Sequence, residues 1–246
     1  MKITILGSGD AFGSGGRYST CLHLTADDGT VMLIDCGATS LLAMQRAGID
    51  RNAISTILLT HFHGDHAGGL PFFLLDALFE SRRTAPLTIA GPKGVRERVA
   101  AITDTAFPGF GTNSFPFPIT YVEVSPEAPA SLAGAGVTAF SVDHDQRAGP
   151  CQGYRIARDG KLFAYSGDTR WTETLVPLAD GADVLLVECY TYDFPLKNHL
   201  DWMTLSARLP DLKAKRIILT HMGPQMLANR DKATVECAED GLVIVP

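Results

Sequence analysis

The stretch that most constrains this chain is Thr60-His61-Phe62-His63-Gly64-Asp65-His66, where three imidazoles and one carboxylate fall within six residues. It directly follows the apolar run Ile57-Leu58-Leu59, whose short length and β-branched content indicate a buried strand. The cluster therefore lies on the loop that leaves the C-terminal end of a strand. Imidazole nitrogens and carboxylate oxygens are the expected ligands of a hydrolytic zinc or manganese site. We interpret the stretch as a metal-binding motif rather than a polar turn.

The same residue types recur at the ends of other predicted strands. His144, Asp168 and His221 each follow a short run with the pattern of a strand. Loops at one end of a sheet converge in space, which is how functional residues are commonly mounted on a rigid frame. We therefore expect these three side chains to join the histidine cluster.

Composition narrows the class of protein. The chain has 246 residues, of which 46% are hydrophobic and 20% charged, enough for one large domain or two small ones. A net charge of −6 argues against broad, non-specific binding of polyanions. The five cysteines are widely spaced and form no C-x-x-C pair, so we expect neither a disulfide framework nor a thiolate zinc site. With no signal-peptide pattern and no membrane-length apolar run, a reducing cytoplasm is the expected location.

Three further segments invite a functional interpretation. The glycine-rich loop at residues 8–16 indicates backbone lying close to another group, although it lacks a dinucleotide-binding pattern. A helix over 70–81 has a broad apolar face, which favours core packing over a dimer surface. The proline density of Phe107 to Pro118 excludes regular structure. We predict that this aromatic loop lies over the site and stacks on a substrate base, with a hydrophobic plug as the alternative.

Together, these motifs resemble the metallo-β-lactamase superfamily and, within it, the ribonuclease Z-like phosphodiesterase branch. The likeness covers nearly the whole chain. Its pieces are Gly7-Ser8-Gly9, Asp35-Cys36-Gly37, the histidine cluster, Gly91-Pro92, His144, Ser166-Gly167-Asp168-Thr169, Glu188, His199 and Thr220-His221. The resemblance implies an α/β fold of the αββα sandwich type: two packed β-sheets, helices outside and a two-metal site at one edge. It implies a single hydrolase domain over residues 1–246.

The resemblance also implies a set of metal ligands. One ion would be held by His61, His63 and His144, a second by Asp65, His66 and His221, and Asp168 would bridge both. We expect two divalent ions per chain, Zn²⁺ first and Mn²⁺ as the alternative. Two cations about 3.5–4 Å apart polarise substrate oxygens and stabilise an in-line displacement.

Other residues have implied supporting roles. In the ribonuclease Z-like pattern, His199 protonates the leaving oxygen and Glu188 orients the imidazole and raises its pKa. We place Asp65 with these two as a catalytic residue in addition to its role as a ligand. Asp35 is expected to support the ligand loop by hydrogen bonds.

Departures from the family pattern separate the candidate functions. Only 23 residues (168 − 144 − 1) lie between His144 and Asp168, where ribonuclease Z usually carries a long arm that grips tRNA. We therefore expect a phosphodiesterase for a small or nucleotide-like diester. The small cyclic phosphodiesterases of phosphonate breakdown share this compact form and a stretch like Asn198-His199-Leu200-Asp201, but they carry a cysteine-rich zinc site that this chain lacks.

Four alternatives stay open. The first is a tRNA 3′-processing endoribonuclease that uses a replacement basic grip formed by Arg82, Arg83, Lys93, Arg96 and Arg98, although such residues are more often a solvated face. The second and third are a lactone and a thioester hydrolase, because a fold does not fix a function. The fourth is a metal-binding module without catalysis, which the complete set of seven ligand-type residues disfavours. RNA is a partner only in the first case, no membrane partner is expected, and the apolar helix at 70–79 makes a homodimer plausible.

Overall fold

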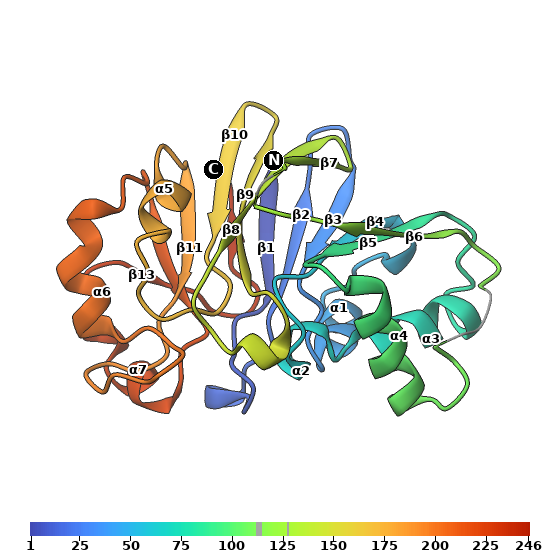
Figure 1. Ribbon diagram of the computed structural model, residues 1–246, viewed down its shortest axis with the longest axis horizontal. Helices are drawn as coiled ribbons and strands as arrows, with labels where there is room; N and C mark the ends of the chain where they lie inside the picture. Colours follow the sequence, from blue (N-terminus) through green and yellow to red (C-terminus); the bar gives the residue numbers. More distant parts are fainter. Residues whose placement is uncertain (112–114, 127) are drawn as a thin grey trace.

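The computed structural model describes residues 1–111, 115–126 and 128–246. Within these residues, two seven-stranded sheets pack face to face and helices cover the outer faces (Figure 1). The first sheet has the strand order β14-β1-β2-β3-β4-β5-β6, and the second has the order β13-β12-β11-β10-β9-β8-β7. This arrangement confirms the αββα sandwich expected from the sequence.

The strands of the first sheet are β1 (Lys2–Gly7), β2 (Cys21–Thr25), β3 (Val31–Ile34), β4 (Ile54–Leu58), β5 (Leu87–Gly91), β6 (Ile119–Glu123) and β14 (Val243–Ile244). Those of the second are β7 (Ala130–Leu132), β8 (Ala135–Ser141), β9 (Gln152–Arg158), β10 (Lys161–Tyr165), β11 (Val184–Glu188), β12 (Ile217–Thr220) and β13 (Glu236–Cys237). The α-helices are α1 (Ser40–Arg46), α2 (Gly64–Ala67), α3 (Leu70–Phe79), α4 (Val95–Ala106), α5 (Leu175–Ala179), α6 (Trp202–Arg208) and α7 (Pro224–Ala228).

Three apolar clusters hold the layers together. The central one lies between the sheets and includes Ile3, Ile34, Tyr154 and Phe163. A second fills the space between the first sheet and helices α1, α3 and α4. A third lies under α5, α6 and α7 on the second sheet. Buried strands with apolar residues on both faces are typical of sheets covered on both sides, and this explains the continuous apolar runs in β11 and β12.

Strand direction brings the functional loops to one edge. Strands β3 to β6 run parallel to one another, and so do β10 to β13. Strand β8 points the same way as β10, because both are antiparallel to β9. The C-terminal ends of these strands therefore meet at the lower edge of the sandwich in Figure 1, beside α2. This is the edge at which the sequence placed the metal ligands.

The aromatic loop has a different role from the one expected. Phe110 and Phe117 are buried in the apolar cluster beneath α3 and α4, and Phe107 and Phe115 pack against the same cluster. Ring contacts run from Phe107 to Phe110, on to Phe115 and then to Phe117. The described part of Phe107 to Pro118 thus forms the hydrophobic plug that was the alternative, and in this chain it does not cover the site. Residues 112–114 of the predicted lid lie outside the described residues.

Strand β7, between β6 and β8, pairs with β8 across a tight turn. One local feature differs from expectation. The ligand loop after β4 is partly helical, because Asp65 and His66 belong to the short helix α2. No helix among the described residues is both long and apolar enough to cross a lipid bilayer.

Candidate metal centre and active site

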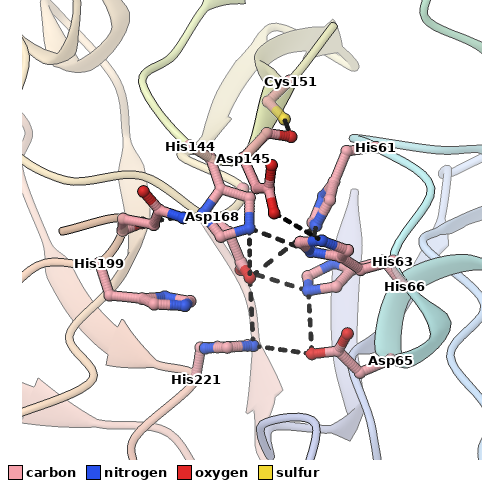
Figure 2. A network of polar contacts seen from close by, with 12 residues as sticks. His61, His63, Asp65, His66, His144, Asp145, Cys151, Asp168, His199 and His221 are labelled. Atoms are coloured by element: carbon pink, nitrogen blue, oxygen red, sulfur yellow. Dashed lines mark hydrogen bonds and ion pairs between the residues drawn. The ribbon is translucent and has the colours of Figure 1, made fainter. Parts of the chain in front are cut away.

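Seven side chains from four strand ends converge at the lower edge of the sandwich (Figure 2). Those from the first sheet follow β4 and lie on or beside α2. The others follow β8, β10 and β12 of the second sheet. Two groups result, each with its ligand atoms within 4.8 Å of one another. The first consists of His61, His63, His144 and Asp168, and the second of Asp65, His66, Asp168 and His221.

The first group is built from three imidazole nitrogens that face one another. Nε2 of His61 lies 3.0 Å from Nδ1 of His63, and Nε2 of His144 lies 3.1 Å from the same Nδ1 atom. Oδ2 of Asp168 lies 3.9 Å from His61 and 3.8 Å from His144. Burial, together with neighbouring imidazoles, keeps the pKa of His61 well below its usual value, and burial lowers the pKa of His63. Neutral imidazoles have the lone pair that a metal ligand needs.

The second group surrounds a point between two carboxylates. Nε2 of His66 lies 3.2 Å from Oδ1 of Asp168 and 3.5 Å from Oδ2 of Asp65. Nε2 of His221 lies 3.1 Å from Asp65 and 3.4 Å from Asp168. Oδ2 of Asp168 faces both the first group and His221 of the second, while Oδ1 faces His66, so this carboxylate lies between the two groups, as a bridging ligand would. His221 adopts a left-handed backbone conformation with φ of 56°, and its N–H donates to the carbonyl of Ser8, which fixes the turn after β12.

The donor set fits two cations. Nε2 of His66 and Oδ1 of Asp168 are buried and lack a hydrogen-bond partner, which is costly for polar atoms in a protein interior. Burial alone would lower the pKa of His66, but Asp168, Asp65 and Asp35 raise it well above its usual value. The carboxylates thus create a strong preference for positive charge at this point. Divalent cations would satisfy both the unpaired atoms and this charge.

A second layer of hydrogen bonds orients the ligands. Asp35 is fully buried, and its Oδ2 atom lies 2.8 Å from Nδ1 of His66. Its other oxygen accepts the backbone N–H of Thr60 at 2.8 Å, directly before the cluster. Nδ1 of His144 lies 2.8 Å from the carbonyl oxygen of Asn198, which turns its Nε2 atom toward the metal position. Such partners fix the tautomer and direction of a metal-bound imidazole.

His199 and Glu188 form a separate pair beside the two groups. Nδ1 of His199 lies 3.2 Å from each oxygen of Glu188, and the imidazole faces the cluster (Figure 2). Glu188 ends β11, is fully buried, and also accepts the backbone N–H groups of Thr169 and Leu200. Burial lowers the pKa of His199, but the Glu188 carboxylate outweighs this and raises it to about 9. The pair is therefore arranged to carry a proton near neutral pH.

A cavity of about 600 Å³ opens onto the cluster, which is within the usual range of small-molecule sites. His63, Asp65, Asp168, His199 and His221 line its polar end. The remaining wall contains Ala11, Phe12, Ser19, Ala38, Gly64, Tyr190 and Leu196. Sequence reasoning missed Phe12, Tyr190 and Leu196. The only available signal was their place in loops next to ligand-type residues.

The basic residues considered as an RNA grip behave differently from one another. Arg83 is 1% exposed and donates to backbone carbonyls, including those of Ile54 and Pro86, so it cannot contact a ligand. The guanidinium of Arg96 lies 4.7 Å from the ring centre of Tyr121, away from the cavity. Arg83 was therefore wrongly included among the candidate contacts.

The sequence model described as anti-Pycsar protein Apyc1 matches residues 1–241 of this chain. The chain belongs to the Apyc1 family. Curated ribonuclease Z proteins are also similar to this Apyc1-family chain. That of Agathobacter rectalis is 35% identical over 165 residues, covering 66% of the chain and 51% of the relative. That of Mycobacterium sp. strain KMS is 30% identical over 194 residues, covering 76% and 67%. The matches confirm membership of the ribonuclease Z-like branch, although the chain spans about half the length of the first of these relatives.

Solved structures place the Apyc1-family chain in the same fold. The metallo-β-lactamase fold protein YhfI from Bacillus subtilis superposes with a TM-score of 0.78 over 99% of both chains, at 18% identity. A diphosphatase of the PhnP family gives a TM-score of 0.79, covering all of this chain and 97% of its own, at 21% identity. At these identities the likeness establishes the metallo-β-lactamase fold.

Proposed function

We propose that this Apyc1-family chain is a two-metal phosphodiesterase for small or nucleotide-like diesters, with residues 1–246 acting as one hydrolase domain. The proposal rests mainly on one observation. The two donor groups share Asp168, and they face the same cavity as the His199–Glu188 pair. A metal-binding module without catalysis would need neither the cavity nor a buried carboxylate that holds a proton on a neighbouring imidazole. The family description, anti-Pycsar protein, names what its members counteract and leaves the cleaved bond open.

The metal ligands in this proposal are His61, His63 and His144 for one ion, Asp65, His66 and His221 for the other, and Asp168 for both. Zn²⁺ suits the imidazole-rich first group, and Mn²⁺ is the alternative because carboxylates are prominent in the second. Such a pair of ions would polarise the phosphoryl oxygens and make water nucleophilic at neutral pH. Asp65 would contribute to catalysis as a carboxylate ligand that positions the ion and the water it activates.

His199 supplies the proton for the leaving group. In the reaction water adds to phosphorus, the bond from phosphorus to the leaving oxygen breaks, and that oxygen takes a proton. Since Nδ1 of His199 faces Glu188, Nε2 is the nitrogen that can donate into the cavity. Glu188 orients the ring and stabilises its protonated form, which is the usual role of a carboxylate behind an acid histidine.

Two features support a small substrate. No Lys or Arg is among the described residues that line the cavity, so the cavity itself offers no row of cations along which a polyanion could bind. The residues between His144 and Asp168 form a short 3₁₀ turn and the β9–β10 hairpin, and the hairpin belongs to the second sheet. It therefore has no room for a long substrate-gripping arm.

Processing of tRNA 3′ ends is the second candidate, because the curated relatives are named ribonuclease Z. This candidate needs a contact surface for tRNA outside the cavity. Lys197, Arg170 and Arg147 lie in a smaller hollow next to His144 and are the best-placed cations for such a role. Two of them are engaged, however, since Arg147 pairs with Asp145 and Arg170 with Asp143.

A substrate panel tests the proposal. The full chain, loaded with Zn²⁺ or Mn²⁺, is assayed against bis(p-nitrophenyl) phosphate, a 2′,3′-cyclic nucleotide, a lactone, a thioester and precursor tRNA. We expect metal-dependent hydrolysis of the first two and little turnover of the others. Faster cleavage of precursor tRNA would favour the ribonuclease, and turnover of only the lactone or thioester would refute a phosphodiesterase.

Two further parts of the proposal concern the setting of the enzyme. All five cysteines are unpaired thiols, which supports a reducing compartment such as the cytoplasm. A homodimer through α3 is supported by Phe72 and Phe79, which are 46% and 65% exposed, while Phe73 and Leu74 of the same helix are buried in the core. Light scattering of the full chain measures this directly.

A further inference from the structure

A second large cavity lies at the edge of the sandwich opposite the metal cluster. It has a volume of about 880 Å³, and its lining includes residues at or just before the N-terminal ends of β10, β11 and β12. Because the C-terminal ends of these strands lie at the lower edge, this cavity lies at the upper edge in Figure 1. Its volume is typical of small-molecule sites. None of the described residues that line it belongs to the donor groups or to the catalytic cavity.

The floor of this upper-edge cavity is the outer face of the second sheet, where the side chains are small. The strand register places Gly136 of β8 beside Ala157 of β9, and Ala157 beside Leu162 of β10. A glycine inside a strand often marks the close approach of a ligand or of another backbone. No described segment covers Gly136, because a Cβ atom placed there would meet only Ala157, at 3.9 Å. The floor is therefore open to a ligand.

The cations around the cavity are only partly neutralised. The charged residues of the lining are Arg155, Arg158, Asp159, Lys161, Asp183 and Lys215. Arg158 pairs with Asp28 and Asp159, and Lys215 pairs with Asp183. Arg155 donates to a backbone carbonyl, and neither Arg155 nor Lys161 forms an ion pair with a carboxylate of the described chain. In a chain with a net charge of −6, two unpaired cations at one cavity favour an anionic ligand.

The two unpaired cations stand apart along the β9–β10 hairpin. Arg155 lies opposite Ala164 in the register, and Lys161 lies opposite Arg158. This is a separation of three residue positions, or about 10 Å along the strands. Arginine and lysine are the usual phosphate-binding side chains. An anion with a phosphate at each end can contact both cations without bringing their like charges together.

We propose that the upper-edge cavity is a second, non-catalytic binding site for a small bisphosphate. One phosphate would contact Arg155 and the other Lys161, while the linker between them lies over Gly136 and Ala157. Thr138 lines the cavity beside Arg155 and would supply a hydroxyl group to a polar linker. A ligand bound in this way would span β8, β9 and β10 and stabilise the folded chain. The site does not depend on which ester is cleaved at the metal edge.

Equilibrium binding tests this site without turnover. Isothermal titration calorimetry on the Zn²⁺-loaded full chain measures Kd for fructose 1,6-bisphosphate and for fructose 6-phosphate, which lacks one phosphate. We expect the native chain to bind the bisphosphate at least about fivefold more tightly, as one added charge-assisted contact would provide. Arg155→Gln and Lys161→Gln should each reduce this preference to less than about twofold.

Two further variants separate the floor from general surface charge. Gly136→Leu should weaken binding of the bisphosphate at least about tenfold, because the new side chain would occupy the floor. Lys213→Gln is the matched control, since Lys213 is an exposed lysine of the same loop as Lys215 but does not line the cavity. Its Kd for both esters should equal that of the native chain. The melting temperature of each variant shows whether it is folded, and the two glutamine variants test the site even if Gly136→Leu is not.

Each contrary outcome has a defined meaning. Binding of the bisphosphate only at the metal cluster would give equal affinity for the two esters and a Kd that no cavity variant changes, and this would overturn the site. Absence of binding by the native chain at about 1 mM bisphosphate would also overturn it. Native affinity in both glutamine variants would show that Arg155 and Lys161 hold no phosphate. Since none of these measurements needs hydrolysis, failure of the phosphodiesterase proposal would leave the result unchanged.

Discussion

Nδ1 of His199 lies 3.2 Å from both oxygens of the Glu188 carboxylate, and the same carboxylate accepts two backbone N–H groups. The carboxylate is thereby fixed in place, and the histidine is fixed by it. Because one ring nitrogen is engaged, the other is the only one that can exchange a proton with a ligand. This relationship makes the acid role of His199 open to direct tests.

Replacing His199 should affect substrates according to their leaving groups. An alkoxide leaving group needs a proton, whereas p-nitrophenolate departs as a stable anion. We therefore expect His199→Ala to lower kcat for a nucleotide or alkyl diester by about 10²–10⁴-fold and for bis(p-nitrophenyl) phosphate far less. Steady-state kinetics with metal analysis of each variant provides the check. Equal losses on both substrates at unchanged metal content would leave His199 as a binding or structural residue.

The pH dependence of kcat should depend on the charge of the Glu188 carboxylate. A general acid works in its protonated form, so its contribution is present below its pKa and lost as pH rises through it. The pKa of His199 is about 9, because Glu188 raises it against the effect of burial. Glu188→Gln removes the charge, so the alkaline decline of kcat on an alkyl diester should begin at lower pH. Bound cations would lower the pKa of His199 in the native chain and in Glu188→Gln alike. The quantity to compare is therefore the shift, between the two proteins, of the pH at which kcat begins to decline. An unmoved profile would argue against the pairing.

Metal content should follow the two donor groups. We expect two divalent ions per native chain, and elemental analysis after metal loading and desalting measures them. Asp168→Ala should deplete both sites because Asp168 belongs to both groups, whereas His221→Ala should mainly empty one. His23→Gln is the matched control. His23 is the one histidine that belongs neither to the two donor groups nor to the His199–Glu188 pair. One ion or none in the native protein would contradict the two-metal site.

Asp35 should influence metal affinity without touching a metal. Its carboxylate orients His66 and accepts from Thr60, and loss of such a partner typically lowers metal affinity about 10–100-fold. Asp35→Asn keeps the size but removes the charge, and competition with a chromophoric chelator gives the affinity. The melting temperature of the metal-free variant separates this effect from general destabilisation. Native affinity in Asp35→Asn would show that the hydrogen bonds do not tune the ligand.

The sequence was most informative where chemistry and pattern coincide. The apolar runs before His61 and His221 predicted strands, and parallel strands bring their C-terminal ends to one edge of a sheet. The convergence of the ligand residues could therefore be foreseen from local patterns. The short helix at Asp65 and His66 was missed, because Gly64 and these two residues have weak helix propensity and the turn is stabilised by its surroundings.

The aromatic loop shows the limit of such reasoning. Its prolines correctly excluded regular structure, yet the choice between a lid and a plug depends on which surface lies opposite. Phe110 and Phe117 find an apolar layer beneath α3 and α4, and burying both side chains stabilises that packing. Conversely, the backbone N–H of Phe12 donates to the buried Asp10 carboxylate, and the Phe12 side chain is exposed. No local pattern distinguishes a buried phenylalanine from an exposed one when tertiary contacts decide.

The donor groups also have a consequence for how the chain assembles. His61 and His221 stand 160 positions apart (221 − 61), on different sheets, and Asp168 joins their two groups. The ion sites therefore form only when the two halves of the sandwich have docked. Each bound ion would then link residues of one half to residues of the other. By mass action, free metal at a hundred times its Kd would add about 2.7 kcal/mol per site against unfolding. Metal supply would thus set the free energy of unfolding of the chain as well as its chemistry.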